Sequence, residues 1–182
     1  MSELYSGGAA GDMIVGAIRR FADRPAIADE RQRWTYRELG QTIGRLITFF
    51  NQLGLKKGDA VSVLSSNRVE SWAIICAAAV MGLRYTPLHP LAAEDDHAFI
   101  IDDAEIDALV VESGKFSERG LAIQARAPKL KHLLSLGPIA GARDLLAELP
   151  ACDSAPLQPA TSADDLCWLA YTGGTTGKSK GV

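Results

Sequence analysis

Apolar residues recur along most of this chain at the intervals typical of helices and strands in alternation. The clearest helical stretch follows Thr35, which forms a capping box with Glu38, a pair that satisfies free amides at the start of a helix. Apolar positions then recur every three or four residues up to Leu53, and Gly54 stands where a left-handed residue commonly ends a helix. The pattern predicts a helix over residues 35–53.

Short apolar runs rich in β-branched residues alternate with further helical stretches. A short helix after Asp12 and a hairpin formed by 25–29 and 32–34 come first. The expected strands are then 60–64, 84–88, 108–111 and 130–136. The expected helices are 67–82, 91–103, 116–127 and 141–149, with Asn67 as the cap of the first and Gly82 at its end. Strands and helices in this order favour a parallel sheet, so the predicted fold class is α/β, a mainly parallel sheet flanked by helices.

The C-terminal part of the chain has a different composition. Residues 150–164 are rich in Pro, Ala, Ser, Asp and Thr, which indicates a surface linker. The apolar run Leu166–Tyr171 predicts a last, buried strand of the sheet. The predicted organisation is therefore an α/β body over 1–149, the linker over 150–164, and a strand with its loop over 165–182.

Bulk composition excludes several classes of protein. The 182 residues are 47% hydrophobic and carry a formal net charge of −3, so a folded core is expected and capture of nucleic acid by bulk charge is not. The longest apolar run, 72–81, is too short for a transmembrane segment, and the N-terminus lacks the pattern of a secretory signal. Three widely spaced cysteines, expected to be buried thiols, fit a reducing cytoplasmic compartment better than a disulfide framework.

Histidines, aspartates and tryptophans offer no stronger candidates for chemistry. The three histidines lack metal-type spacing and are expected on the surface or in loops, so no metal site is predicted. The pairs Asp95–Asp96 and Asp102–Asp103 are expected on a solvated helix face. The tryptophans are expected to serve packing, because no basic residues are interleaved with them as nucleic-acid binding would require.

The segment 172–181 combines residue types that suit a polyphosphate. It contains four glycines, three threonines and two lysines directly after the predicted last strand. Glycines expose backbone amides to an anion, threonine hydroxyls add donors, and the lysines add positive charge. Because open α/β sheets bind ligands beyond the carboxyl ends of their strands, we interpret this segment as a phosphate-binding loop. The alternative is a flexible Gly/Thr turn that binds nothing.

A Walker A loop is a second alternative for the same segment. That motif requires a glycine, four residues and then Gly-Lys-Ser/Thr. Gly177, Lys178 and Ser179 match its end, but the required first glycine falls on Thr172. The Walker interpretation therefore fails.

The loop instead resembles the signature of the adenylate-forming superfamily of acyl-CoA synthetases, luciferases and peptide-synthetase adenylation domains. The typical pattern is Tyr-Thr-Ser-Gly-Thr-Thr-Gly-x-Pro-Lys-Gly-Val, and residues 171–182 match it, with Gly173 in place of the serine and Ser179 in place of the proline. The segments 34–39, 58–61 and 82–87 are also similar to this family. The chain as a whole is most similar to a fatty acyl-CoA ligase.

The resemblance implies that the loop holds the β- and γ-phosphates of ATP. The candidate phosphate-binding residues are Thr172, Gly173, Gly174, Thr175, Thr176, Gly177, Lys178 and Lys180. Lys180 matches the lysine that recurs in the family, whereas position 178 is variable there.

The resemblance also implies a reaction. A carboxylic acid would attack the α-phosphate of ATP, giving an acyl-adenylate and pyrophosphate, and the acyl group would pass to the thiol of coenzyme A. Mg²⁺ is implied as a cofactor, but its ligands, the ribose-binding aspartate, the acid pocket and the C-terminal lysine belong to later motifs of the family that these residues do not include. We therefore expect an inactive N-terminal piece of the large domain of a longer enzyme, with no catalytic residue assigned within it.

Other readings of the chain remain open at this point. A fatty acid is the expected substrate and an aryl carboxylate the runner-up, while a carrier protein could replace coenzyme A as the acceptor. A non-catalytic nucleotide-binding or interaction module that kept the loop is the rival function. Such a piece would expose apolar surface, so self-association is also expected.

Overall fold

A computed structural model describes residues 8–172 and 179–182 of the chain. The helices are α1 (Ala10–Arg20), α2 (Tyr36–Gln52), α3 (Val69–Met81), α4 (Glu94–Asp103), α5 (Ser117–Arg126) and α6 (Leu145–Glu148), with a 3₁₀ turn at Leu149–Ala151. The strands are β1 (Pro25–Ala28), β2 (Arg33–Thr35), β3 (Ala60–Leu64), β4 (Arg84–Pro87), β5 (Ala108–Glu112), β6 (His132–Leu136), β7 (Arg143–Asp144), β8 (Tyr171–Thr172) and β9 (Lys180–Gly181).

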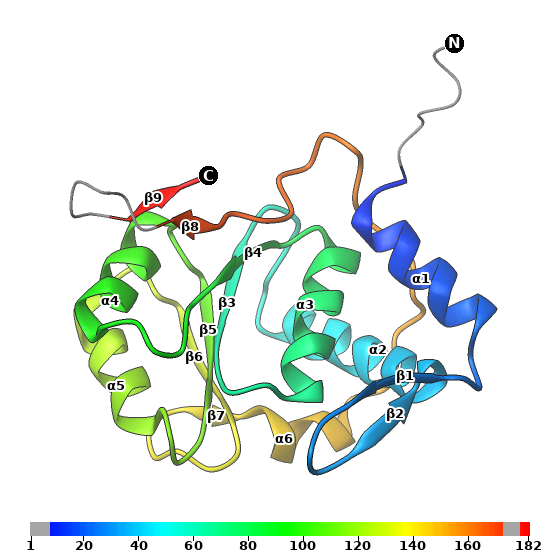
Figure 1. The fold of residues 1–182 in the computed structure, drawn as a ribbon, viewed down its shortest axis with the longest axis horizontal. Coiled ribbons are helices and arrows are strands. Elements are labelled where there is room, and N and C mark those ends of the chain that lie inside the picture. The colour runs from blue at the N-terminus through cyan, green and yellow to red at the C-terminus, as the bar shows by residue number, and fades with distance from the viewer. Residues whose placement is uncertain (1–7, 173–178) are drawn as a thin grey trace.

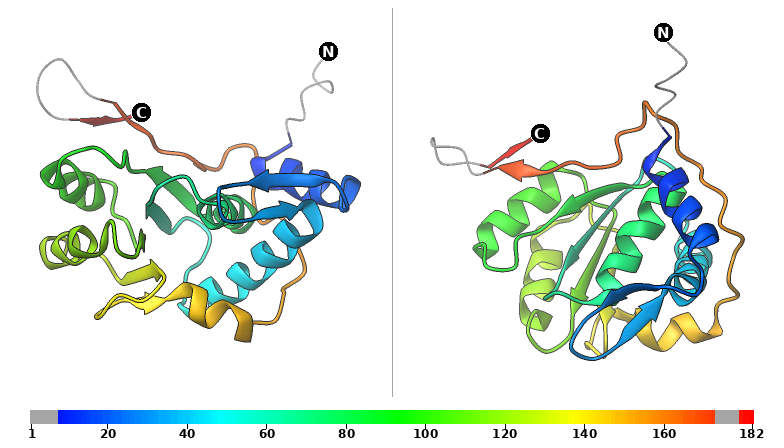
Figure 2. Two further views of the ribbon diagram at one scale, coloured as in Figure 1. Left: turned by 60° about the horizontal axis from the view of Figure 1, so that its bottom comes forward. Right: turned by 45° about the vertical axis from the view of Figure 1, so that its right-hand side comes forward.

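A five-stranded parallel sheet forms the centre of the molecule. Its strand order is β4-β3-β5-β6-β7, and every neighbouring pair is parallel. Helices lie on both faces, with α2 and α3 on one side and α4 and α5 on the other (Figures 1 and 2). The predicted α/β class with a mainly parallel sheet is confirmed.

Alternation of side chains along the strands divides the apolar core into two layers. In β3, Val61 and Val63 belong to the core under α2 and α3, whereas Ala60 and Leu64 belong to the core under α4 and α5. Successive side chains of a strand point to opposite faces, so a strand that is apolar throughout is buried on both sides. This is why β3 and β5 are fully buried.

The predicted start of α2 is confirmed in detail. Thr35 caps the helix, because its side chain accepts from the Glu38 amide and the Glu38 carboxylate accepts from the Thr35 amide at 2.7 Å. Gly54 has a φ of +80° just beyond the helix, as a left-handed terminal residue requires. The hairpin of β1 and β2 is also confirmed as an antiparallel pair.

The predicted cap of α3 is wrong. Arg68, not Asn67, precedes the helix, and it makes no capping bond with its side chain. The carboxylate of Asp29, in the turn after β1, accepts instead from the Val69 amide at 3.1 Å and from the amides of Arg31 and Gln32 at 2.8 Å. The cap therefore comes from a distant segment and ties the hairpin to the start of α3.

Two further predictions need correction near the C-terminus. Residues 141–149 were expected to form one helix, but Asp144 ends the short strand β7 and caps the one-turn helix α6 through the Leu146 and Ala147 amides. The segment Leu166–Tyr171 was expected to be a buried strand, but it forms a single parallel bridge with β4 at Tyr85, and Leu166 is 58% exposed. It runs along the outer edge of β4, where no further strand of the described chain covers it.

Residues 153–162, inside the predicted linker, have no helix or strand but are attached along their length. The Ala155 amide donates to the Gly44 carbonyl in α2, and Arg19 in α1 donates to the Leu157 carbonyl. We call this segment the strap. It passes the outer side of α2 and α1 and leads the chain back to the edge of β4 (Figure 2).

Candidate functional site

The strand order creates a switch point at the carboxyl edge of the sheet. From β3 the chain turns to α3 on one face, and from the neighbouring β5 it turns to α5 on the other face. Loops that diverge in this way leave a crevice, which is where open α/β sheets usually bind ligands. The crevice between the ends of β3 and β5 is therefore the first place to look for a site.

The side chain of Glu112 crosses this crevice and bonds to the loop after β3. Glu112, the last residue of β5, accepts from the Ser66 amide at 2.8 Å and from the Ser66 hydroxyl at 2.5 Å. Nitrogen atoms of Arg68 and Arg31 each lie 3.6 Å from its other oxygen. Ser66 and the two arginines are thus engaged with carboxylates of the protein itself, Ser66 and Arg31 with Glu112 and Arg68 with both Glu70 and Glu112.

The pKa values of this network agree with a permanently charged, structural arrangement. Burial would raise the pKa of Glu112, but the hydrogen bonds from Ser66 and the charges of Arg68 and Arg31 outweigh burial and lower it. The side-chain hydrogen bond to Glu70 is the main reason that the pKa of Arg68 is raised. An apolar strand that ends in glutamate is the sequence signal that could have revealed this network.

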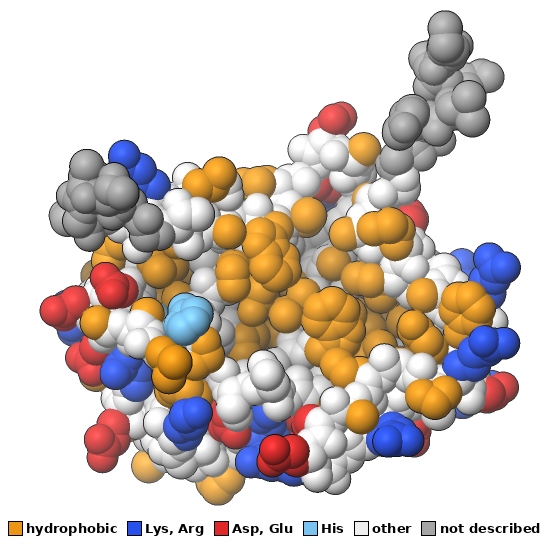
Figure 3. Space-filling model, viewed as in Figure 1, with side chains coloured by type: hydrophobic (Ala, Val, Ile, Leu, Met, Phe, Trp, Pro, Cys, Tyr) orange, Lys and Arg blue, Asp and Glu red, His pale blue; other side chains and the backbone are white. Residues whose placement is uncertain are grey.

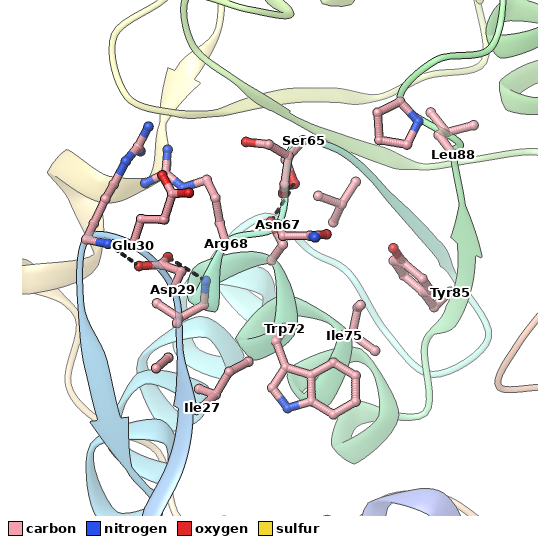
Figure 4. A pocket seen from close by; sticks show the side chains of 17 residues that line it. Ile27, Asp29, Glu30, Ser65, Asn67, Arg68, Trp72, Ile75, Tyr85 and Leu88 are labelled. Carbon is pink, nitrogen blue, oxygen red and sulfur yellow. Dashed lines mark hydrogen bonds between the residues drawn. The ribbon is translucent and has the colours of Figure 1, made fainter.

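A cavity of about 810 Å³ opens beside the network. Asp29, Glu30 and Arg68 lie on its polar side, and Trp72, Ile75 and Tyr85 form an apolar wall opposite them (Figure 4). The polar side carries charges of both signs, so the cavity has no net preference for a polyphosphate.

The two ends of the predicted phosphate-binding loop pair with each other, beyond the segment that lies along the outer edge of β4. Strands β8 and β9 are antiparallel, with Thr172 opposite Lys180 and Tyr171 opposite Gly181. Ala170 and Val182 extend the pairing, since each amide donates to the other residue's carbonyl, at 3.2 and 2.8 Å. We call this paired segment the loop stem.

The loop stem lies against α4 and not at the carboxyl edge of the sheet (Figure 1). The Tyr171 hydroxyl donates to the Asp103 carboxylate at 2.5 Å, and Asp103 is the last residue of α4. Since α4 leads into β5, this end of the helix lies where the strands begin. The expectation that the loop would follow a strand of the central sheet is therefore wrong, although the loop does follow the short strand β8.

A second cavity, of about 540 Å³, separates the loop stem from the β4–α4 connection. Tyr171 and Ser179 of the stem line it together with His89, Asp96 and Ile100. Of the predicted site residues, Thr172 and Lys180 thus lie side by side on this stem. Gly173, Gly174, Thr175, Thr176, Gly177 and Lys178 lie outside the described residues.

His97 contradicts the expectation of surface histidines. It is fully buried, its Nε2 atom bonds the His89 carbonyl at 2.8 Å, and Arg119 bonds its Nδ1 atom at 3.2 Å. Because Arg119 can only donate, Nδ1 accepts and Nε2 carries the proton. Burial, aided by the charge of Arg119, lowers the pKa of His97. His97 is therefore neutral, and its two ring nitrogens join α4 to the β4–α4 connection and to Arg119 of α5.

The remaining candidates are structural for the most part. Cys76 and Cys152 are buried as expected, whereas Cys167 is only half-buried. Asp95 pairs with Arg126 at the surface, in agreement with a solvated face. Trp168 packs on Tyr85 with ring centroids 4.8 Å apart, yet it remains 45% exposed.

Residues 8–172 and 179–182 contain no group of three or more His, Cys, Asp or Glu side chains that could hold a metal ion. Likewise, none of the helices described above combines the length and the apolar character needed to cross a membrane.

Comparison with known proteins gives consistent results. Residues 16–182 match the sequence profile of a family described as AMP-binding enzyme. The chain is 38% identical over 179 residues to a medium/long-chain-fatty-acid–CoA ligase of Mycobacterium tuberculosis, which covers 94% of this chain and 31% of the relative. It is 28% identical over 181 residues to a 2,3-dihydroxybenzoate-AMP ligase of Bacillus subtilis, which covers 97% of this chain and 33% of the relative.

Solved structures share the fold. An anthranilate CoA ligase in complex with anthranoyl-AMP matches all of this chain and 35% of its own, with a TM-score of 0.91 at 21% identity. A fatty acyl CoA synthetase of Mycobacterium tuberculosis matches 96% of this chain and 34% of its own, with a TM-score of 0.83 at 22% identity. The chain thus spans about a third of the length of these relatives.

Proposed function

The chain belongs to the AMP-binding enzyme family, and from that premise we propose that it forms part of an ATP-dependent acid–thiol ligase that acts on a fatty acid. The observation that carries the proposal is the 38% identity with a medium/long-chain-fatty-acid–CoA ligase over 94% of this chain. The sequence of the loop, with its glycines, hydroxyls and lysines, supplies the chemistry that an ATP-dependent step needs.

In the proposed reaction, a carboxylate oxygen of the acid attacks the α-phosphorus of ATP. The bond between the α-phosphorus and the bridging oxygen breaks, and pyrophosphate leaves with the electron pair. The thiolate of coenzyme A then attacks the acyl carbonyl, and AMP leaves. Adenylate is a far better leaving group than the oxide that the free acid would have to lose.

The role proposed for the loop is to hold the β- and γ-phosphates and to stabilise the charge that develops on pyrophosphate. Backbone amides, threonine hydroxyls and Lys180 would provide the donors, because groups fixed in advance lower the barrier most. Mg²⁺ would accompany the nucleotide, but no set of described side chains fits it, so we assign it no site. Such a ligase would work in the cytoplasm, where ATP and coenzyme A are available.

An aryl carboxylate is the alternative acid. The 28% identity with a 2,3-dihydroxybenzoate-AMP ligase over 97% of the chain favours it, but the identity with the fatty-acid relative is higher. Fatty and aryl acids differ in shape and flexibility, so a panel of both classes distinguishes them directly.

The test uses the ligase that contains this segment, with ATP, Mg²⁺ and one acid at a time. Labelled pyrophosphate should exchange into ATP with medium- or long-chain fatty acids, and acyl-CoA should form once coenzyme A is added. Exchange with aryl acids alone would favour the alternative acid. No exchange with any acid would refute adenylation and favour a non-catalytic nucleotide-binding or interaction module. The 182-residue segment alone should give no exchange.

A further inference from the structure

One side chain, Tyr171, connects the loop stem to α4. Its hydroxyl donates to Asp103 Oδ2 at 2.5 Å, across 68 positions of sequence. Its ring meets the Phe99 ring edge-on, with centroids 6.4 Å apart and an interplanar angle of 89°. Phe99 and Asp103 are four residues apart and therefore lie on the same face of α4. A single helix face thus fixes both the ring and the hydroxyl of Tyr171.

The same ring also lies across the second strand of the stem. Gly181 is the partner of Tyr171 in the antiparallel pair. A β-carbon at position 181 would lie 3.3 Å from Tyr171 Cζ and 3.2 Å from Leu169 Cδ1. Glycine at position 181 therefore leaves the space that the ring occupies, and Lys180 directly precedes it in β9. The contact locates both strands of the stem relative to α4.

The Tyr171 hydroxyl is a donor throughout the neutral pH range. Burial, together with the hydrogen bond to Asp103, raises the pKa of Tyr171 to about 12. The acceptor is a carboxylate, and charge-assisted bonds of this kind are shorter and stronger than neutral ones. Because the Asp103 end of the bond is exposed, its effect on overall stability is small, whereas its effect on the position of the stem is direct.

We propose that Asp103 and Tyr171 are positioning residues for the ATP phosphates, since together they hold both ends of the phosphate-binding loop in one place on α4. This inference rests on the role proposed above for the loop. Neither residue has to touch the nucleotide. The loop stabilises departing pyrophosphate only when its donors are already in place, and a displacement of about 1 Å can cost on the order of 10²-fold in rate.

The first experiment compares variants of the ligase that contains this segment. Tyr171→Phe keeps the ring and removes the hydroxyl, and Asp103→Ala removes the acceptor. Each should lower kcat for pyrophosphate exchange roughly 10-fold, less than the loss expected for a misplaced donor, while the KM for the acid and the melting temperature change little. Asp103→Asn keeps an acceptor oxygen and should restore most of the rate. The double variant should be no slower than either single one.

Asp102→Ala is the matched control, because Asp102 is an exposed neighbour at the same helix end. It should leave kcat unchanged. A fall in rate that parallels a fall in melting temperature would overturn the positioning role. A rate in Asp103→Asn that is as low as in Asp103→Ala would overturn it too. Wild-type rates in both single variants would overturn it as well.

A second readout does not depend on catalysis. The amides of Ala170 and Val182 bond across the stem, so their hydrogen exchange reports whether the stem stays paired. Exchange should be faster in Tyr171→Phe than in the wild-type 182-residue chain. Faster amide exchange in that variant, combined with a wild-type ligase that lacks pyrophosphate exchange, would refute the proposed function but leave the anchoring of the stem standing. Unchanged amide exchange would refute the anchoring.

Discussion

Lys180 lies on the loop stem opposite Thr172, at a position that β9 defines. Lys178 lies outside the described residues, so only the sequence distinguishes its expected role from that of Lys180. Its position is variable in the family that the loop resembles, whereas a lysine recurs at the position of Lys180. The two lysines, two residues apart, form a matched pair for testing which charge acts on the phosphates.

In the ligase that contains this segment, we expect Lys180→Ala to impair adenylation more than Lys178→Ala does. A lysine that stabilises charge on departing pyrophosphate acts chiefly in the transition state, so kcat should fall more than apparent ATP affinity. A donor of this kind contributes on the order of 10²–10³ in rate. Pyrophosphate exchange at saturating and limiting ATP measures both effects. A larger loss for Lys178→Ala would show that the alignment of the loop is wrong.

The buried His97 gives a second prediction at this scale, concerning pH. Burial lowers the pKa of His97 in the folded chain, and the charge of Arg119 lowers it further. The hydrogen bond to the His89 carbonyl and the charge of Asp96 act in the opposite direction without cancelling this shift. The unfolded chain therefore binds a proton more readily than the folded one. Stability from this group is complete above the unfolded pKa of about 6.5 and declines as pH falls below it towards the folded value.

Urea unfolding of the 182-residue chain at several pH values between 5 and 8 measures this dependence. His97→Gln should flatten the decline on the acidic side, because the titrating group is gone. His132, whose pKa burial also lowers, would account for a residual slope. An unchanged slope in His97→Gln would contradict the assignment.

Among the elements, the helices show which parts of the fold can be predicted from the sequence. The cap of α2 could be predicted, because Thr35 and Glu38 are three residues apart and bond each other. The cap of α3 could not, because Asp29 lies 40 positions before Val69 and only the tertiary fold brings them together. Local patterns thus fix the type of an element, whereas its long-range partners depend on packing.

The same distinction explains the errors near the C-terminus and at the site. The apolar run Leu166–Tyr171 predicted a buried strand, but it forms only a single bridge with β4, because no local pattern states whether a segment pairs along its whole length. Glu112 and Asp103 drew no functional prediction, because their partners Ser66 and Tyr171 are 46 and 68 positions away. For the loop, sequence predicts the residue types, and the described stem shows Thr172 opposite Lys180.

The strap over α2 leads to a prediction about two helical glycines. A β-carbon at Gly44 would lie 2.2 Å from Ser154 Oγ and 2.7 Å from the Ala155 carbonyl oxygen, so the strap would have to move. A β-carbon at Gly16 in α1 would meet nothing within 4 Å. Alanine is favoured over glycine inside a helix by roughly 1 kcal/mol. Gly16→Ala should therefore raise the free energy of unfolding, and Gly44→Ala should lower it.

Chemical denaturation of both variants tests this opposition, and limited proteolysis locates its cause. Cleavage within residues 153–162 should be faster in Gly44→Ala and unchanged in Gly16→Ala. Stabilisation by both substitutions would mean that the strap does not pack against Gly44.

The molecule as a whole exposes an apolar face along the outer side of β4 and α3. Hydrophobic side chains gather there in the space-filling view (Figure 3). Trp72 is 46% exposed beside Tyr85 in the larger cavity, and Tyr85 packs on Trp168 at the edge of the sheet. We call Trp72, Tyr85, Leu166 and Trp168 the β4 face. Large exposed patches of this kind commonly mark contact surfaces.

We therefore expect the isolated 182-residue chain to self-associate through the β4 face. Burying apolar area is favourable by roughly 25 cal/mol per Å², and the half-exposed indole rings of Trp72 and Trp168 would be buried in such a contact. Light scattering over a concentration series should show the average mass rising with concentration. Trp72→Glu combined with Trp168→Glu should keep the chain monomeric, because each carboxylate would have to be desolvated in the contact. Leu121→Glu, on α5 across the sheet, is the control and should associate like the wild type. A wild-type chain that stays monomeric at high concentration would contradict the prediction. Equal association of the wild type, the double tryptophan variant and Leu121→Glu would place the contact outside the β4 face.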